Sequence, residues 1–223
     1  SKGLILNYCK KMVIIKNYIH SNTMNDIILI IANGPSALKY EYGNEIDTFK
    51  NVARINNYQT NSFEKYIGSK TTIWFNGANK KLKPRFNFNN EIIVFVPYEI
   101  LKAKEDEVIR RTPKRLQINT DKYTLISKQK MKYYETISNI KRPTTGFNSI
   151  LWALDNYKKV IIHGFDFFLE GKEHYYDSFL TKKISNLKIV GKARKHDNVG
   201  EKKFIQALIK ENKVIQLSDF LKR

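Results

Sequence analysis

The feature of this sequence that most constrains its fold is an alternation of short β-branched runs with longer mixed stretches, beginning at Asp26. Each run is bounded by Gly, Asn or Pro, as is typical of buried strands that alternate with helices. We expect strands near 27–32, 51–55, 71–75, 91–96, 160–163 and 213–217, and a seventh near 116–126.

Two stretches carry apolar side chains at spacings of three and four, the pattern of an amphipathic helix. One stripe runs from Phe147 to Tyr157 and the other from Phe204 to Ile209, and each leads into an expected strand. The sequence therefore predicts an α/β fold with one doubly wound, mostly parallel sheet. Rossmann-like sheets of this kind bind ligands at the carboxyl ends of their strands.

The length and composition predict one domain. A chain of 223 residues with 42% hydrophobic content can bury one sizeable core but not two ordinary ones. Residues 1–24 lack a clean helical or alternating period, so we interpret them as an appended segment before a single domain at 25–223. The stretch 97–142 is rich in Lys and polar residues, and we expect a lid within it.

The sequence offers weak indications of location. No apolar run approaches the roughly 18 residues that span a bilayer, and no signal peptide is visible. Cys9 is the only cysteine, which excludes intramolecular disulfides and Cys-rich zinc sites and favours a reducing compartment. We therefore expect a cytoplasmic protein.

The formal net charge of +19 suits nucleic acid, an anionic membrane or an acidic substrate. An AT-rich coding bias towards lysine would give the same excess without any such partner. The densest basic groups lie at 80–85 and 182–195, where they fit an anionic acceptor, a lipid surface or simply a solvated face. Charge alone leaves these alternatives open.

The run Asn33-Gly34-Pro35-Ser36 follows the first expected strand. Gly34 permits a tight turn and Pro35 can begin a helix, leaving backbone NH groups and a hydroxyl for an anionic or nucleotide ligand. A plain turn between strand and helix explains these residues equally well. No GxGxxG or GxxxxGK[ST] occurs, which disfavours ordinary dinucleotide and Walker-type sites.

Further polar residues are expected at the same edge of the sheet. Asn56 and Asn57 end the second strand, where their amides suit a ribose, a phosphate oxygen or a pyrimidine, or form a turn. The run Pro143-Thr144-Thr145-Gly146 begins a helix, and its hydroxyls and NH groups can bind a carboxylate or phosphate or serve as an N-cap. Gly164-Phe165-Asp166 follows the strand at 160–163.

Two histidine-containing runs complete the candidate chemistry. His174-Tyr175-Tyr176-Asp177 offers imidazole and phenol donors for a departing phosphate, or an aromatic loop that packs on the core. His196 stands at the start of the last helix, five residues before Glu201. At neutral pH its imidazole can accept a proton from a sugar hydroxyl, although a surface histidine before a capped helix gives the same pattern.

Taken in order, these runs resemble the sialyltransferase motifs of glycosyltransferase family 29 and, more distantly, the bacterial family 42 enzymes. Four runs of this sequence are together similar to the family's large motif: Asn33–Ser36, Ile46-Asp47, Arg54–Asn57 and Gly68–Thr72. The small motif is similar to Pro143–Gly146 through Gly164-Phe165, the third to His174–Asp177, and the very small motif to His196 with Glu201.

The resemblance implies an inverting, CMP-sugar-dependent enzyme on a compact α/β fold, called a variant of the GT-A type. It implies that the enzyme moves sialic acid from CMP-sialic acid to a glycan hydroxyl. It implies that His196 is the general base and that His174, with Tyr175 or Tyr176, stabilises the departing CMP phosphate. By the same resemblance, the nucleotide and phosphate are held by Asn33, Gly34, Ser36 and either Asn56 or Asn57. The sugar carboxylate is held by Thr144, Thr145 and Gly146. The cytidine is held by Gly164, Phe165 and Asp166. Glu201 is expected to support its motif's helix.

We expect neither a metal ion nor a cofactor. CMP leaves as a monoester with less charge than a nucleoside diphosphate, so hydrogen-bond donors can suffice. The sequence contains no DxD, and Glu105-Asp106-Glu107 is interpreted as a solvated helix face.

The sequence departs from the family in two ways. No cysteine stands in the large or small motif, and Ala32 occupies a position where glycine is common before the asparagine. These points favour a bacterial, cytoplasmic enzyme that is peripheral to the inner face of the membrane and acts on a lipid-linked or capsular glycan. One alternative is a Kdo transferase using CMP-Kdo on the same fold; a remote alternative is a non-catalytic module that binds anionic polymers without specific nucleic-acid recognition.

Overall fold

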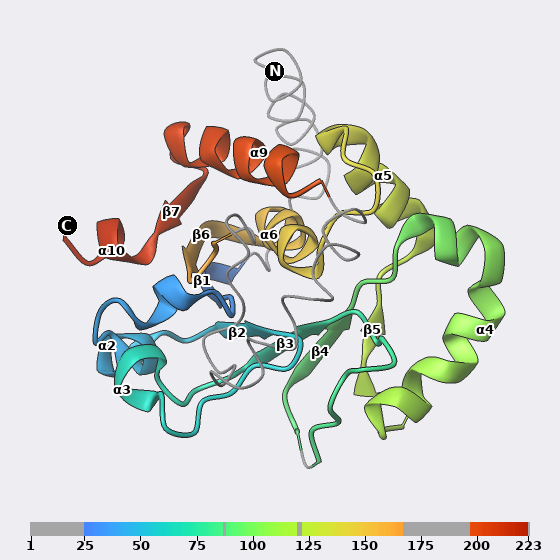
Figure 1. The fold of residues 1–223 in the computed structure, drawn as a ribbon, viewed down its shortest axis with the longest axis horizontal. Helices are drawn as coiled ribbons and strands as arrows, with labels where there is room; N and C mark the ends of the chain where they lie inside the picture. Colours follow the sequence, from blue (N-terminus) through green and yellow to red (C-terminus); the bar gives the residue numbers. More distant parts are fainter. Residues whose placement is uncertain (1–24, 87, 120–121, 167–196, 223) are drawn as a thin grey trace, which may run out of the picture.

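The computed structural model describes residues 25–86, 88–119, 122–166 and 197–222. Helices cover both faces of one central sheet (Figure 1). The strands are β1 Asn25–Ile31, β2 Val52–Ile55, β3 Ile73–Asn76, β4 Glu91–Val94, β5 Thr124–Leu125, β6 Tyr157–His163 and β7 Val214–Gln216. The helices are η1 Pro35–Leu38, α2 Gly43–Thr48, α3 Glu64–Ile67, α4 Tyr98–Leu116, α5 Lys128–Ser138, α6 Thr145–Asn156, α9 Asn198–Lys210 and α10 Leu217–Phe220.

The sheet has the order β5-β4-β3-β2-β1-β6-β7, and the described pairings are parallel. The chain moves outward from β1 to β5 and then returns to the other side of β1 for β6 and β7. The strand order therefore reverses between β1 and β6, and ligands of doubly wound sheets bind outside the carboxyl ends at such a point. The predicted fold class is confirmed.

The core lies on both faces of the sheet, and β1 shows why. Its side chains alternate between the faces, so Ile28 and Ile30 join one apolar cluster while Leu29 and Ile31 join the other. A strand that is buried on both faces needs a continuous apolar run, which is the pattern seen in the sequence. The first cluster includes Leu101 of α4, Met131 of α5, Ile150 of α6 and Ile205 of α9, and the second includes Ile46 of α2, Ile67 of α3 and Leu217 of α10.

The six firmest strand predictions correspond to β1, β2, β3, β4, β6 and β7, and the two apolar stripes correspond to α6 and α9. The seventh strand, expected near 116–126, is the two-residue β5 at the edge of the sheet. Most of 97–142 forms α4, β5 and α5, and a lid function for this stretch stays a prediction. Asp106 and Glu107 are exposed on α4, as the interpretation of a solvated face required.

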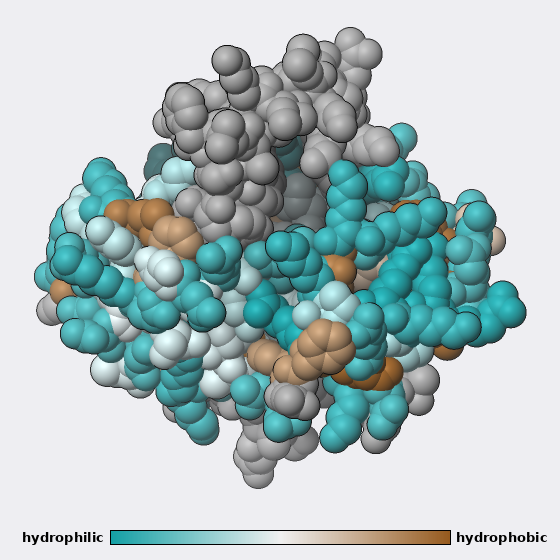
Figure 2. Space-filling view, turned by 60° about the horizontal axis from the view of Figure 1, so that its bottom comes forward, coloured by the Kyte–Doolittle hydropathy of each residue, from teal (hydrophilic) through white to brown (hydrophobic). Residues whose placement is uncertain are grey.

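The face shown in Figure 2 is mostly hydrophilic, with small apolar patches. Among the described helices, none is both long enough and apolar enough to cross a membrane.

A buried guanidinium fixes the segment that leads into β3. Arg54 of β2 is fully buried, and its Nη2 donates to the carbonyls of Ile67 and Gly68 at 2.6 and 3.0 Å. Its Nε donates to the Lys70 carbonyl at 3.1 Å and to Thr71 Oγ1 at 3.0 Å. Arg54 therefore holds the connection between α3 and β3.

Asp47 holds the same connection from the side of α2. Its carboxylate accepts from the backbone NH groups of Ser69 and Lys70 and from the Ser69 hydroxyl. Burial acts to raise the pKa of Asp47, but these hydrogen bonds and the Arg54 charge outweigh it and lower the pKa below its ordinary value.

We expect Arg54→Met to lower the free energy of unfolding by about 3 kcal/mol, because buried carbonyl and hydroxyl acceptors would lose their charged donor. Urea denaturation measures this change. Arg110→Met on the exposed side of α4 is the matched control and should change stability by less than about 0.5 kcal/mol. Equal effects of the two substitutions would contradict the structural role of Arg54.

Candidate active site

The turns that follow β1 and β6 are joined to each other at the point where the strand order reverses. The Gly34 amide donates to the Gly164 carbonyl at 3.0 Å, and the Ser36 amide donates to Asp166 Oδ2 at 3.0 Å. A Cβ atom at Gly34 would lie 2.6 Å from both Asp166 Cγ and the Gly164 carbonyl oxygen. Among the backbone NH groups of this turn, that of Ser36 is therefore already bonded to Asp166, and the role of Ser36 in donor binding stays a prediction.

His163 joins the same two segments from below. Its Nε2 lies 3.0 Å from the Ala37 carbonyl of η1, so the nitrogen must carry the hydrogen and donate it. Burial disfavours the imidazolium and lowers the pKa of His163, which keeps the ring neutral. This histidine therefore ties the end of β6 to η1 through a hydrogen bond.

Three asparagines stand at the carboxyl ends of the adjacent strands β1, β2 and β3. The Asn33 amide donates to the Ile55 carbonyl at 2.9 Å, while its Oδ1 has no partner among the described residues. Asn56 adopts a positive φ of 51°, and its buried Oδ1 is likewise without a partner in the described part of the chain. Asn76 accepts from the Ala78 amide at 3.0 Å, and within the described residues its Nδ2 has no acceptor.

The row of asparagines therefore presents two acceptors and one donor with no bond inside the described structure. Leaving a buried polar atom unpaired costs about 1–3 kcal/mol, so such a row is expected where a polar ligand supplies the missing bonds. Asn76 was not singled out from the sequence. Its position at the end of an expected strand, like that of Asn56, was the signal that could have identified it.

Asn57 has a different task from its neighbour Asn56. Its Nδ2 donates to the Lys81 carbonyl at 3.0 Å, and its Oδ1 accepts from the Lys83 amide at 2.8 Å. Both ends of this side chain hold the segment that follows β3. The structure thus favours Asn56 over Asn57 as the ligand-binding residue of this pair.

The start of α6 lies above the ends of β2, β3 and β6. A Cβ atom at Gly146 would lie 3.3 Å from Phe165 and 3.6 Å from Ile55, and one at Gly77 would lie 3.3 Å from Thr145 Oγ1. Thr144 is the N-cap, and its Oγ1 accepts from the Phe147 amide at 3.1 Å. The predicted residues Thr144, Thr145 and Gly146 are therefore brought to the same edge as Asn33 and Asn56.

A fourth side-chain amide with an unpaired atom lies in the first turn of α6. Asn148 is buried, and its Nδ2 donates to the Pro143 carbonyl at 3.2 Å. Its Oδ1 has no partner in the described residues. Asn148 carries no signal in the sequence, because it falls within the apolar stripe of a helix.

Glu201 of α9 ties that helix to the start of α6. Its carboxylate accepts from the Thr144 amide at 2.6 Å and from the Thr144 hydroxyl at 2.7 Å. Burial raises the pKa of Glu201 to about 7, against the opposing effect of these two hydrogen bonds. The N-cap of α9 is Asp197, which accepts from the Gly200 amide at 2.8 Å.

Several predicted residues cannot be compared with the structure. His174, Tyr175, Tyr176 and His196 lie outside the described residues, so their roles stay predictions. Within the described ranges, no three His, Cys, Asp or Glu side chains gather closely enough to hold a metal ion.

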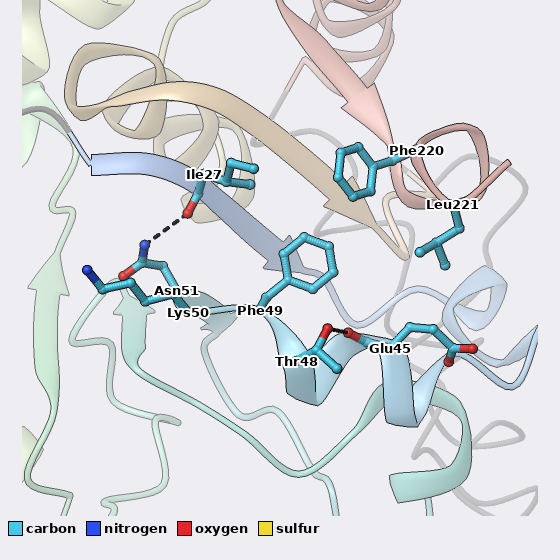
Figure 3. Close-up of a pocket in the computed structure, with 8 residues that line it drawn as sticks. All are labelled: Ile27, Glu45, Thr48, Phe49, Lys50, Asn51, Phe220 and Leu221. Atoms are coloured by element: carbon cyan, nitrogen blue, oxygen red, sulfur yellow. Dashed lines mark hydrogen bonds between the residues drawn. The ribbon is translucent and has the colours of Figure 1, made fainter. Parts of the chain in front are cut away.

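A separate pocket of about 500 Å³ lies at the opposite, amino edge of the sheet (Figure 3). Ile27, Phe49, Phe220 and Leu221 supply apolar walls. Two of its polar groups are already bonded, since Asn51 donates to the Ile27 carbonyl at 2.9 Å and Thr48 donates to the Glu45 carbonyl at 2.6 Å. The carboxyl edge is therefore the better candidate site for a polar ligand.

The model of glycosyltransferase family 29 (sialyltransferase) matches residues 26–213, which include the described residues of this edge. The chain belongs to this family. The family 29 match covers the turns after β1 and β6, the start of α6 and the start of α9.

Two of the curated relatives that the chain matches are named sialyltransferases. CMP-N-acetylneuraminate-β-galactosamide-α-2,3-sialyltransferase 1 of Gallus gallus is 27% identical over 157 residues, which are 66% of this chain and 46% of the relative. The corresponding sialyltransferase 2 of Mus musculus is 27% identical over 203 residues, covering 83% and 55%. The family 29 chain thus spans about half the length of these relatives. A β-1,6-galactosyltransferase of Arabidopsis thaliana is 42% identical over 50 residues, 22% of this chain and 13% of that protein.

Solved structures share the fold. A mammalian sialyltransferase in complex with Gal-β-1,3-GalNAc-ortho-nitrophenol has a TM-score of 0.66 at 20% identity, covering 86% of this chain and 69% of that chain. Another structure of a mammalian sialyltransferase has a TM-score of 0.64 at 19% identity, covering 95% and 78%.

The raised pKa of Glu201 predicts a pH dependence of stability. Because the pKa rises from 4.5 to about 7 on folding, this group's contribution is complete below pH 4.5 and is lost as the pH rises to about 7. Between these two pH values, the unfolding free energy of wild type should fall by about 3 kcal/mol more than that of Glu201→Gln. Guanidinium titrations at both pH values measure the difference.

Glu64→Gln, at an exposed position of α3, is the control and should keep the wild-type pH dependence. Identical pH dependence of wild type and Glu201→Gln would refute the assignment.

Proposed function

We propose that this family 29 chain moves sialic acid from CMP-sialic acid to a glycan hydroxyl, with inversion and without a metal ion. The observation that carries the proposal is the row of unpaired amides at the carboxyl edge, overhung by the start of α6. Such a site offers neutral hydrogen-bond partners to a nucleotide and a helix N-terminus to an anion.

The donor would lie along this edge with its groups matched to the side chains. Asn33 and Asn56 would hold the nucleotide and phosphate, and Asn76 would add a donor beside them. The backbone NH groups of Thr145 and Gly146 would receive the sugar carboxylate, because the N-terminus of a helix favours negative charge. The sialylmotif interpretation of the sequence gives the same roles to Asn33, Asn56, Thr145 and Gly146, whereas the role of Asn76 is proposed from the structure.

The proposed transfer needs no reactant besides the CMP-sugar donor and the acceptor hydroxyl. The acceptor oxygen attacks the anomeric carbon from the side opposite CMP, the bond from that carbon to the phosphate oxygen breaks, and the hydroxyl proton passes to His196. His174 and a neighbouring tyrosine would donate hydrogen bonds to the CMP phosphate as it leaves. The monoester leaving group is the reason that no metal is proposed.

We further propose a bacterial type of enzyme that works in the cytoplasm at the inner face of the membrane. The absence of cysteines from the large and small motifs supports a reducing compartment. A lipid-linked or capsular glycan would then be the acceptor.

A donor panel tests the function. The purified chain is incubated with CMP-sialic acid, CMP-Kdo or an activated galactose donor and a set of glycan acceptors, and mass spectrometry follows the product and the released nucleotide. Galactose is included because one relative is named a galactosyltransferase. We expect turnover of CMP-sialic acid that survives EDTA. If CMP-Kdo alone is turned over, Kdo replaces sialic acid as the transferred sugar. Turnover of the activated galactose donor alone, or loss of transfer with EDTA, would contradict the proposal.

Three variants should distinguish residues that bind CMP from residues that act in the transfer step. His196→Ala should keep CMP affinity but lose transfer by 10²-fold or more, as expected for a general base. Asn56→Ala should weaken CMP binding by roughly tenfold, because a direct hydrogen bond is lost. Asn57→Ala, which loses only contacts to the segment after β3, should change CMP affinity little.

Calorimetric titration with CMP and a transfer assay measure the two quantities. Near-normal turnover of His196→Ala would remove it as the base, and equal CMP affinity of Asn56→Ala and wild type would remove Asn56 from the donor site.

A further inference from the structure

The connection from β3 to β4, residues 77–90, differs from the other crossovers of the sheet. Parallel strands are usually joined through a helix, yet the described residues of this connection form none. Long connections without secondary structure are commonly functional. The segment contains Lys80, Lys81, Lys83 and Arg85 and has neither Asp nor Glu.

The inner side of this connection is firmly held. Arg115 of α4 donates to the Ala78 carbonyl at 2.6 Å, and Leu82 is buried in the core. The Arg85 guanidinium lies 3.3 Å from the centre of the Tyr58 ring and also donates to the Tyr58 carbonyl. Together with the two bonds from Asn57, these contacts fix the backbone, so the outward side chains present a defined surface.

The outer side carries unpaired positive charge beside an apolar ring. Lys80, Lys81 and Lys83 are exposed, and within the described part of the chain none of them forms an ion pair. Phe86 is 74% exposed, more than any other large hydrophobic side chain among the described residues.

We propose that residues 80–86 form a docking surface for an anionic membrane. The lysines bind the lipid phosphates, and Phe86 enters the headgroup layer, where an aromatic ring beside basic residues is stabilised. Each lysine near an anionic leaflet strengthens binding by about fivefold. A single-stranded nucleic acid fits less well, because stacking along such a strand uses several aromatic side chains in a basic groove.

The position of the surface gives it a use in the proposed reaction. The connection begins at Gly77, where an added Cβ would lie 3.3 Å from Thr145 of the candidate active site. A chain docked through residues 80–86 would be held at the membrane surface that carries a lipid-linked acceptor. This use rests on the proposed transferase function, whereas the membrane binding itself does not.

Vesicle co-sedimentation of the 223-residue chain tests the surface. Wild type should bind vesicles of phosphatidylcholine mixed with phosphatidylglycerol and should not bind phosphatidylcholine alone. K80Q/K81Q/K83Q should partition roughly 100-fold more weakly, and Phe86→Ser should bind severalfold more weakly with an unchanged salt dependence. The control K203Q/K210Q/K213Q removes the same charge from exposed positions on α9 and before β7, and it should bind like wild type.

Three results would overturn the proposal. One is wild type failing to bind the anionic vesicles. Another is equal loss of binding in the two triple variants, since net charge alone would then explain the attraction. The third is binding of single-stranded DNA as tightly as the vesicles, with vesicle binding unaffected by Phe86→Ser. No donor is present in these assays, so failure of the docking surface is distinguished from failure of sugar transfer to a soluble acceptor.

Discussion

β1 and β6 pair in parallel from Asn25 opposite Tyr157 to Ile31 opposite His163. This long-range pairing sets out the candidate site, because the turns that follow two paired parallel strands must leave the sheet side by side. It also fixes α6, which runs directly into β6 and must therefore lie antiparallel to it. The start of α6 is consequently placed over the carboxyl edge of the sheet. The asparagines at the ends of β1, β2 and β3 lie at this edge.

The close approach of the two turns explains why glycine stands in each of them. Gly164 has a positive φ of 71°, and a Cβ atom there would meet the Ala32 carbonyl at 2.8 Å. Gly34 is equally confined by Asp166 and the Gly164 carbonyl. A glycine after the first strand is readily interpreted as room for a nucleotide, but at Gly34 the neighbour is the protein's own backbone. Within the described residues, the atom of this turn that is left for a ligand is Asn33 Oδ1, which is buried without a partner.

The parts of the fold that could be predicted are those with a local cause. Strands buried on both faces need unbroken apolar runs, which the sequence displays, whereas the two-residue β5 at the sheet edge needs none. Asn56 and Asn57 are alike in sequence, and only the contacts of Asn57 with Lys81 and Lys83 distinguish them. The availability of the Ser36 amide was likewise decided by Asp166, 130 residues away. A sequence pattern does not show which distant residue a polar group will bond.

The tie between Glu201 and Thr144 shows how two motifs distant in sequence act as one unit. The Glu201 carboxylate is buried and has a pKa of about 7, so holding two helices together through it costs desolvation free energy. An apolar contact between the helices would not have this cost. What the carboxylate provides is direction, since it accepts both donors of Thr144 at 2.6 and 2.7 Å and so sets α9 against the first turn of α6. His196 immediately precedes the N-cap of α9, and Thr145 immediately follows the N-cap of α6. This pair of hydrogen bonds fixes the start of α6, which carries the proposed carboxylate site, against α9. Substitutions at Glu201 and Thr144 should therefore not act independently.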